Sequence, residues 1–65
     1  MHALFINTSA ASAVLEQVNK TAKDHGLRGT AFIVPHFYRR ACKGFKVRWT
    51  SFTGKGFFIT EEMLA

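Results

Sequence analysis

Cysteine is almost absent: Cys42 is the only one among 65 residues, so no disulfide can form within the chain. A domain of this size buries a small core, and many such domains add disulfides, a metal or self-association for stability. The three histidines and Cys42 show none of the close spacings typical of a structural zinc site. We therefore expect one folded domain over residues 1–65, without metal or other cofactor, and either monomeric or a homodimer.

Long apolar runs are also absent. The longest, residues 3–6 and 31–34, are far below the ~20 residues that a membrane-spanning helix needs. The N-terminus lacks the cationic start, the apolar stretch and the small-residue cleavage site of a secretory signal. A single unpaired cysteine fits a reducing compartment. These absences predict a cytoplasmic protein that has no membrane partner.

Acidic residues are few, and the middle of the chain has none. Two lie before residue 25 and two after residue 60, whereas the net charge of the chain is +5. The cations between His25 and Thr60 are Arg28, Arg39, Arg40, Lys43, Lys46, Arg48 and Lys55. A cationic segment without acids indicates an anionic partner, most often a nucleic acid and otherwise an acidic protein surface.

Aromatic residues, by contrast, are plentiful. The sequence holds seven Phe, and 48% of its residues are hydrophobic, which is too many for a disordered chain. Seven Phe exceed what one helix and one sheet face of a small domain bury, so we expect at least one or two of them on the surface. Exposed rings beside cations are typical of a surface that binds nucleic acid or a protein partner.

Residues 8–25 have the pattern of an amphipathic helix, because apolar residues recur at the spacing of one helical face. These residues are Ala11, Val14, Leu15, Val18 and Ala22. Asn7, Thr8 and Ser9 are all good N-caps, and Gly26 supplies a C-terminal stop. The apolar stripe is modest in bulk, so the helix needs a sheet to pack on.

The strands are less uniform in their signals. Residues 3–6 predict a short strand, and the β-branched and aromatic residues at 30–34 predict another. After Pro35 two interpretations stay open. In the first, an edge strand continues to about Arg40 and residues 41–44 turn the chain. In the second, Pro35 begins a short helix that ends before Gly44. We favour the strand.

The segment that follows is clearer. Phe45, Val47 and Trp49 alternate with polar residues, as in a half-buried antiparallel strand. Residues 52–55 predict a turn, and residues 57–59 a return strand. The predicted fold is α+β, with the order β-α-β-β-β and one amphipathic helix packed on a small, mostly antiparallel sheet.

Residues 20–27, with the sequence KTAKDHGL, resemble the first half of a helix-turn-helix and are closely similar to that segment in lambdoid Cro repressors. The resemblance implies DNA binding through a second, recognition helix, and it covers eight residues of the chain. That recognition helix would fall on residues 30–35, where β-branched residues and Pro35 oppose a helix. The polar side chains that read bases are missing there too.

Catalysis finds little support in the sequence. Cys42 has cationic neighbours, which lower the pKa of a thiol, and His36 is a candidate base. No acid lies near them in the sequence, and a chain this short forms few enclosed pockets. Residues 53–56, TGKG, lack the spacing of a phosphate-binding loop and fit a hairpin turn instead. We therefore expect a non-catalytic protein.

The candidate binding residues are the cations on the last strands and their turns. They are Arg39, Arg40, Lys43, Lys46, Arg48 and Lys55. If the alternating apolar residues face the helix, Lys46 and Arg48 face away from it. Tyr38, Phe52 or Phe58 on that same face would stack on bases.

These observations favour a small basic protein that binds nucleic acid, DNA or RNA, through a cationic, aromatic-bearing sheet face. Sequence readout would be weak, because no recognition element is evident. The alternative is a protein-binding module or inhibitor, of an accessory or phage type, that docks on an acidic surface of a larger partner.

Overall fold

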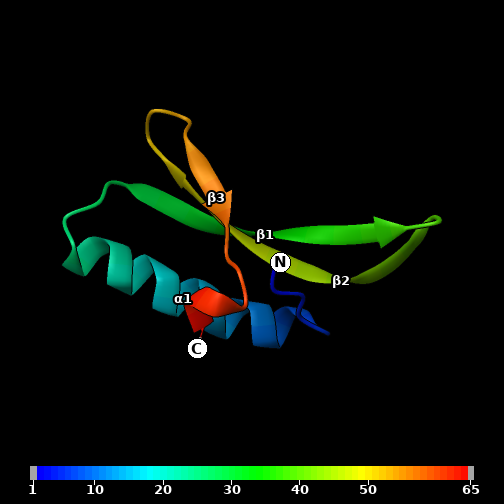
Figure 1. Cartoon of the computed structure of the whole chain (residues 1–65). Helices are drawn as coiled ribbons and strands as arrows, with labels where there is room; N and C mark the ends of the chain where they lie inside the picture. Colours follow the sequence, from blue (N-terminus) through cyan, green and yellow to red (C-terminus); the bar gives the residue numbers. More distant parts are fainter. Residues whose placement is uncertain (1, 65) are drawn as a thin grey trace.

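One helix packs against one face of a three-stranded antiparallel sheet, as the computed structural model of the chain shows for residues 2–64 (Figure 1). The strand order is β1-β2-β3, so β2 is central. The elements are α1 (Thr8–Asp24), β1 (Gly29–Tyr38), β2 (Ala41–Ser51), β3 (Gly56–Phe58) and the 3-10 turn η1 (Glu62–Leu64). The α+β prediction is confirmed.

Helix α1 begins and ends where its capping residues predict. The Asn7 side chain accepts a hydrogen bond from the backbone N–H of Ala10 at 2.8 Å, which satisfies one of the free donors of the first turn. At the other end Gly26 has a φ of 73°, the left-handed conformation that glycine adopts at low cost. The helix turns Ala11 fully into the core.

The N-terminal segment, predicted as a strand, makes only isolated pairings. The backbone of Phe5 exchanges hydrogen bonds with Phe45 of β2, whereas the N–H of Ala3 donates to the carbonyl of Ile59. The segment thus divides its hydrogen bonds between two neighbours instead of following one of them. A continuous ladder needs successive residues to face the same strand, so no regular strand forms here.

Strand β1 runs straight through Pro35, which settles the choice between strand and helix in favour of the strand. The proline is tolerated because β1 is an edge strand and Pro35 lies opposite Phe45 without an N–H to satisfy. Residues 30–35, where a recognition helix would fall, all lie in β1 instead. The helix-turn-helix resemblance therefore ends with the close of α1.

The chain reverses at Arg39 and Arg40, not at residues 41–44 as expected. Gly44, whose presence suggested the later turn, has another use. Its φ is 152°, and a Cβ there would lie 2.8 Å from the carbonyl oxygen of Phe5. The glycine therefore permits the close approach of the N-terminal segment to β2.

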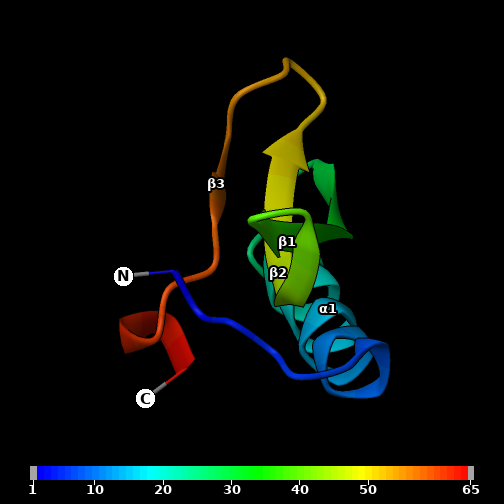
Figure 2. The same cartoon turned by 90° about the vertical axis from the view of Figure 1, so that its right-hand side faces the viewer.

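The predicted alternation along β2 is confirmed. Val47 and Trp49 are buried against the helix layer, Phe45 is half-buried beside them, and Ile59 joins the same core. Figure 2 shows α1 beneath β1 and β2, with η1 on the β3 side of the chain. No helix within residues 2–64 is long and apolar enough to cross a membrane.

Candidate nucleic-acid interface

The sheet face turned away from α1 carries a row of alternating aromatic and cationic side chains. Register pairs Phe32 of β1 with Arg48 of β2, and Arg48 in turn with Phe58 of β3. Directly paired residues project to the same side of a sheet, opposite to the buried Val47 and Trp49. Phe32, Arg48 and Phe58 therefore form one row across all three strands.

Two cationic side chains pack against the ring of Phe58, at the β3 end of this row. The Nζ atom of Lys46 lies 5.3 Å from the centroid of the Phe58 ring, and the Cζ atom of Arg48 lies 5.1 Å from it. Both distances are within the range of a cation–π attraction. The imidazole of His2 also stacks on Phe58, with the ring centroids 4.6 Å apart. These contacts fix the two cationic side chains above the sheet surface.

Arg39 and Arg40 are the two central residues of the β1–β2 hairpin turn, with φ angles of 51° and 65°. Two successive residues with positive φ define the type I′ turn, in which Asn-Gly is the favoured pair. Each left-handed non-glycine residue costs roughly 1–2 kcal/mol. The guanidinium of Arg39 packs over the ring of Tyr38 at 5.3 Å. Both arginines are exposed, at a conformational cost that Asn-Gly would not carry.

The two remaining predicted residues flank the row. Lys43 is exposed beside the β-bulge in the β1–β2 ladder, where it has no register partner. Lys55 is exposed in the turn between β2 and β3, and its carbonyl accepts a hydrogen bond from the N–H of Ser51. The predicted cations thus follow the length of β2 and its two turns.

They do not form one compact cluster. Lys46 and Arg48 lie together on the sheet face, whereas Arg40 is eight residues before Arg48 along an extended strand. At about 3.3 Å per residue, these two arginines are separated by roughly 26 Å. The arrangement is a line of positive charge with the aromatic row across its middle. An extended polyanion fits a line better than a compact anion does.

One aromatic residue of the row was missed by sequence reasoning. Phe58 was among the candidates for stacking, but Phe32, which is 42% exposed, was not. Only the register with Arg48 reveals that it lies on the basic face. Of the other candidates, Tyr38 lies under Arg39 at the hairpin tip, and Phe52 is 79% exposed in the β2–β3 turn.

The fold also brings an acid to this face. A shallow depression beside the row is lined by His2, His36, Lys46 and Glu61, together with Leu4 and Thr60. Glu61 belongs to the C-terminal segment and lies outside the acid-free part of the sequence. The basic face is consequently less uniform than the sequence predicted, since a carboxylate stands at the end where Lys46 lies.

Metal binding and thiol chemistry are the two other kinds of site considered from the sequence. Within residues 2–64 no group of three His, Cys, Asp or Glu side chains is placed to hold a metal ion. Cys42 is exposed near the hairpin tip. Its thiol donates only to the carbonyl of Gly44, at 3.5 Å.

These features define a small α+β protein with a basic, aromatic-bearing sheet face. Searches of protein-family models, curated proteins and solved structures find no match to the chain.

Proposed function

We propose that the protein binds single-stranded nucleic acid along β2, on the sheet face that carries Phe32, Arg48 and Phe58. The row formed by these three residues, with Lys46 beside it, is the observation that carries the proposal. Proteins that bind single strands combine a cationic track for the backbone with aromatic rings on which bases stack. The face combines both on neighbouring strands.

In this proposal each part of the surface has a separate task. Phe32 offers the more exposed ring and receives a base, for which stacking contributes about 1–3 kcal/mol. Lys46 and Arg48 contact the phosphates on either side of that base. The arginines of the hairpin tip and Lys55 extend the phosphate contacts to the two ends of the line. The contacts are mainly with the backbone, so affinity depends weakly on base sequence.

The hairpin tip gives further support. Positions 39 and 40 hold arginines where Asn-Gly would cost less conformational free energy. Strained residues concentrate at functional sites, where the strain is retained because the side chain is needed. Two long cationic side chains at a projecting turn are suited to reach a phosphate backbone.

The test is a titration of labelled single-stranded DNA and RNA at several salt concentrations. We expect binding at low salt and a linear fall of log K with log salt, with a slope of about −0.7 for each phosphate contacted. The double variant Lys46→Ala/Arg48→Ala should weaken binding and flatten the slope by about 1.4. The matched control is Lys20→Ala/Lys23→Ala, which removes the same charge from α1 and should leave the slope nearly unchanged.

The outcome also decides the alternative. Equal losses in the two double variants would show that only net charge matters and would contradict a site on the sheet face. Absence of binding at about 50 mM salt would refute the proposal, because phosphate contacts bind more tightly at low salt. The acidic surface of a protein partner would then be the next candidate for the same cations.

A further inference from the structure

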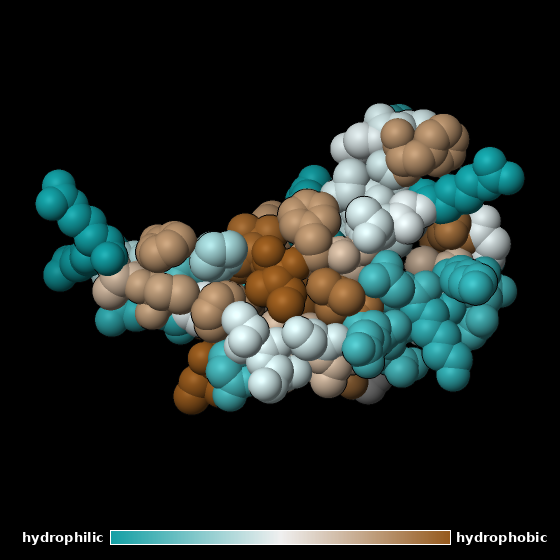
Figure 3. Space-filling model, turned by 180° about the vertical axis from the view of Figure 1, so that it is seen from behind, coloured by the Kyte–Doolittle hydropathy of each residue, from teal (hydrophilic) through white to brown (hydrophobic). Residues whose placement is uncertain are grey.

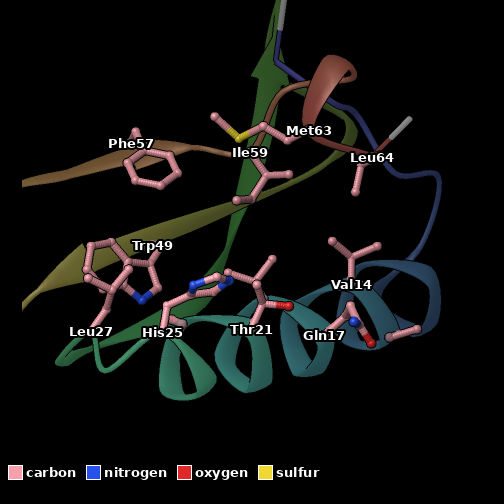
Figure 4. A pocket seen from close by; sticks show the side chains of 13 residues that line it. Val14, Gln17, Thr21, His25, Leu27, Trp49, Phe57, Ile59, Met63 and Leu64 are labelled. Atoms are coloured by element: carbon pink, nitrogen blue, oxygen red, sulfur yellow. The ribbon is translucent and has the colours of Figure 1, made fainter.

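The opposite layer of the molecule contains an apolar groove. Helix α1 packs on β1 and β2 but not on β3, so the inward side of β3 is left without a helix. The open space, of about 400 Å³, lies between α1, the inner side of β2 and β3, and η1 (Figure 4). Val14 and Val18 line it from the helix, Trp49 and Phe57 from the sheet, and Met63 and Leu64 from η1.

A polar atom within this groove has no partner. The Nε1 atom of Trp49 is buried and makes no hydrogen bond, and the residue as a whole is only 8% exposed. The indole cannot move toward the sheet freely, because it lies over Gly29, where a Cβ would come within 2.6 Å of the ring. A buried donor without an acceptor destabilises the folded chain, because the loss of its hydration is not compensated. Figure 4 shows Trp49 at the wall of the groove, facing the helix across it.

The exposed area of the chain is larger than expected for a monomer. Its solvent-accessible surface is 4887 Å², whereas a folded chain of 7.3 kDa has about 4,200 Å². The excess of about 700 Å² is close to the ~800 Å² that each partner buries in a standard interface. One further protein surface of that size would restore the ordinary ratio of buried to exposed area.

Charge indicates which surface pairs with a second copy. The chain has a net charge of +5, so two copies repel each other through the basic sheet face. The residues that line the groove include no Asp, Glu, Lys or Arg. Two copies therefore approach each other most easily here, whereas an acidic partner would find no fixed cation.

The other apolar surface, along the free edge of β1, is poorly suited to self-association by strand pairing. Apolar side chains gather at the middle of this edge, above α1 (Figure 3). The outward N–H of Ala31, however, already donates to the Oδ1 atom of Asn19 at 3.0 Å, and Pro35 has no N–H. A second strand would find few free donors along β1.

We propose that two copies of the chain associate groove to groove in a two-fold dimer. Met63 and Leu64 of each copy cover the groove of the other, and the apolar walls formed by Val14, Val18 and Phe57 lose their contact with water. An isologous contact of this kind is self-complementary and closed. It leaves both basic sheet faces on the outside, and it stands independently of nucleic-acid binding.

The experiment is sedimentation over a wide concentration range under reducing conditions, which prevent a disulfide between Cys42 residues. Trp49 is the only tryptophan, so its emission reports the state of the groove directly. We expect a dimer whose dissociation on dilution shifts the emission to longer wavelength. Leu64→Glu and, separately, Met63→Glu should raise the dissociation constant at least about 30-fold, as for a residue at the centre of an interface.

Phe37→Glu is the matched control, because Phe37 is equally apolar and exposed, lies outside the groove, and acquires the same charge. This variant should remain dimeric. Circular dichroism checks that each variant is folded. A wild-type chain that stays monomeric at millimolar concentration overturns the proposal. So does a dimer that Phe37→Glu dissociates while folded Leu64→Glu and Met63→Glu chains remain dimeric.

Discussion

The guanidinium of Arg48 lies over the ring of Phe58, 5.1 Å from its centroid, on the strand next to it. Lys46 approaches the same ring at 5.3 Å. A single aromatic side chain on a three-residue strand therefore positions both cations of the central sheet face. The contribution of Phe58 to stability and to binding can be separated by mutation.

Replacing Phe58 by Leu should lower both the stability of the fold and the affinity for single strands. The apolar volume is largely kept, but two cation–π contacts of about 0.5–1 kcal/mol each are lost. We expect the free energy of unfolding in urea to fall by about 1–2 kcal/mol, with weaker binding to single strands. Phe52→Leu, at a ring that is 79% exposed, is the control and should change unfolding by less than about 0.5 kcal/mol. Equal effects of the two substitutions would contradict the role given to Phe58.

The hairpin tip should separate stability from binding. The double variant Arg39→Asn/Arg40→Gly gives the turn its favoured residues and should raise the free energy of unfolding by about 1–2 kcal/mol. Binding to single strands should nevertheless weaken, because two phosphate contacts are lost. The control Arg39→Gln/Arg40→Gln removes the same charges without relieving the strain, so its binding should fall equally without a gain in stability. A stabilised variant with undiminished affinity would exclude the tip from the site.

The side chain of Asn19 protects the edge of β1. Asn19→Ala removes the acceptor of the Ala31 N–H and should cost about 1 kcal/mol of unfolding free energy. Hydrogen exchange at the Ala31 amide should accelerate more than at amides bonded between β1 and β2. Ser12→Ala, on an exposed part of the same helix outside the apolar groove, controls for the change in helix propensity. An unchanged exchange rate of the Ala31 amide in the Asn19→Ala variant would show that Asn19 does not protect the edge of β1.

The turn after β3 should respond to acid. The pKa of the Glu62 carboxyl lies below its ordinary value of 4.5, because the carboxylate accepts hydrogen bonds from the backbone N–H of Glu62 and from the Thr60 hydroxyl. A depressed pKa means that the ionised form favours the folded state, so this contribution is present above pH 4.5 and is lost as pH falls through the lowered pKa. An NMR titration of Glu62 checks the direction of this shift, and Thr60→Val should raise the pKa. A pKa that Thr60→Val leaves unchanged would remove the hydroxyl from this account.

Local patterns predicted the parts of the fold that local physics decides. The caps at Asn7 and Gly26, the apolar spacing of α1 and the alternation around Val47 each depend on residues near in sequence. The turn at Arg39 and Arg40 did not follow from such rules, because two arginines are unfavourable in it. Its position is set by the pairing of the two long strands instead.

The candidate site divides in the same way. Strand alternation was enough to place Lys46 and Arg48 on the outer face. The contribution of Phe32 depends on the register between β1 and β2, and the approach of Glu61 depends on how the C-terminal segment folds back. Neither relationship is present in any short stretch of sequence. Both depend on the tertiary contacts between segments that are distant in sequence.

The pairings of the N-terminal segment have a consequence for the order of folding. Within residues 2–64, the backbone pairings of this segment join residues that are farther apart in sequence than those of any other pairing. They are His2 with Thr60, Ala3 with Ile59, and Phe5 with Phe45. Contacts that close long loops form late, after helix and hairpins. Until these contacts form, the backbone N–H and carbonyl of Phe45 have no partner on the side of β2 that later binds Phe5. In a concentrated solution we expect refolding chains to pair with one another at this edge, since an unpaired strand edge is a template for a second chain.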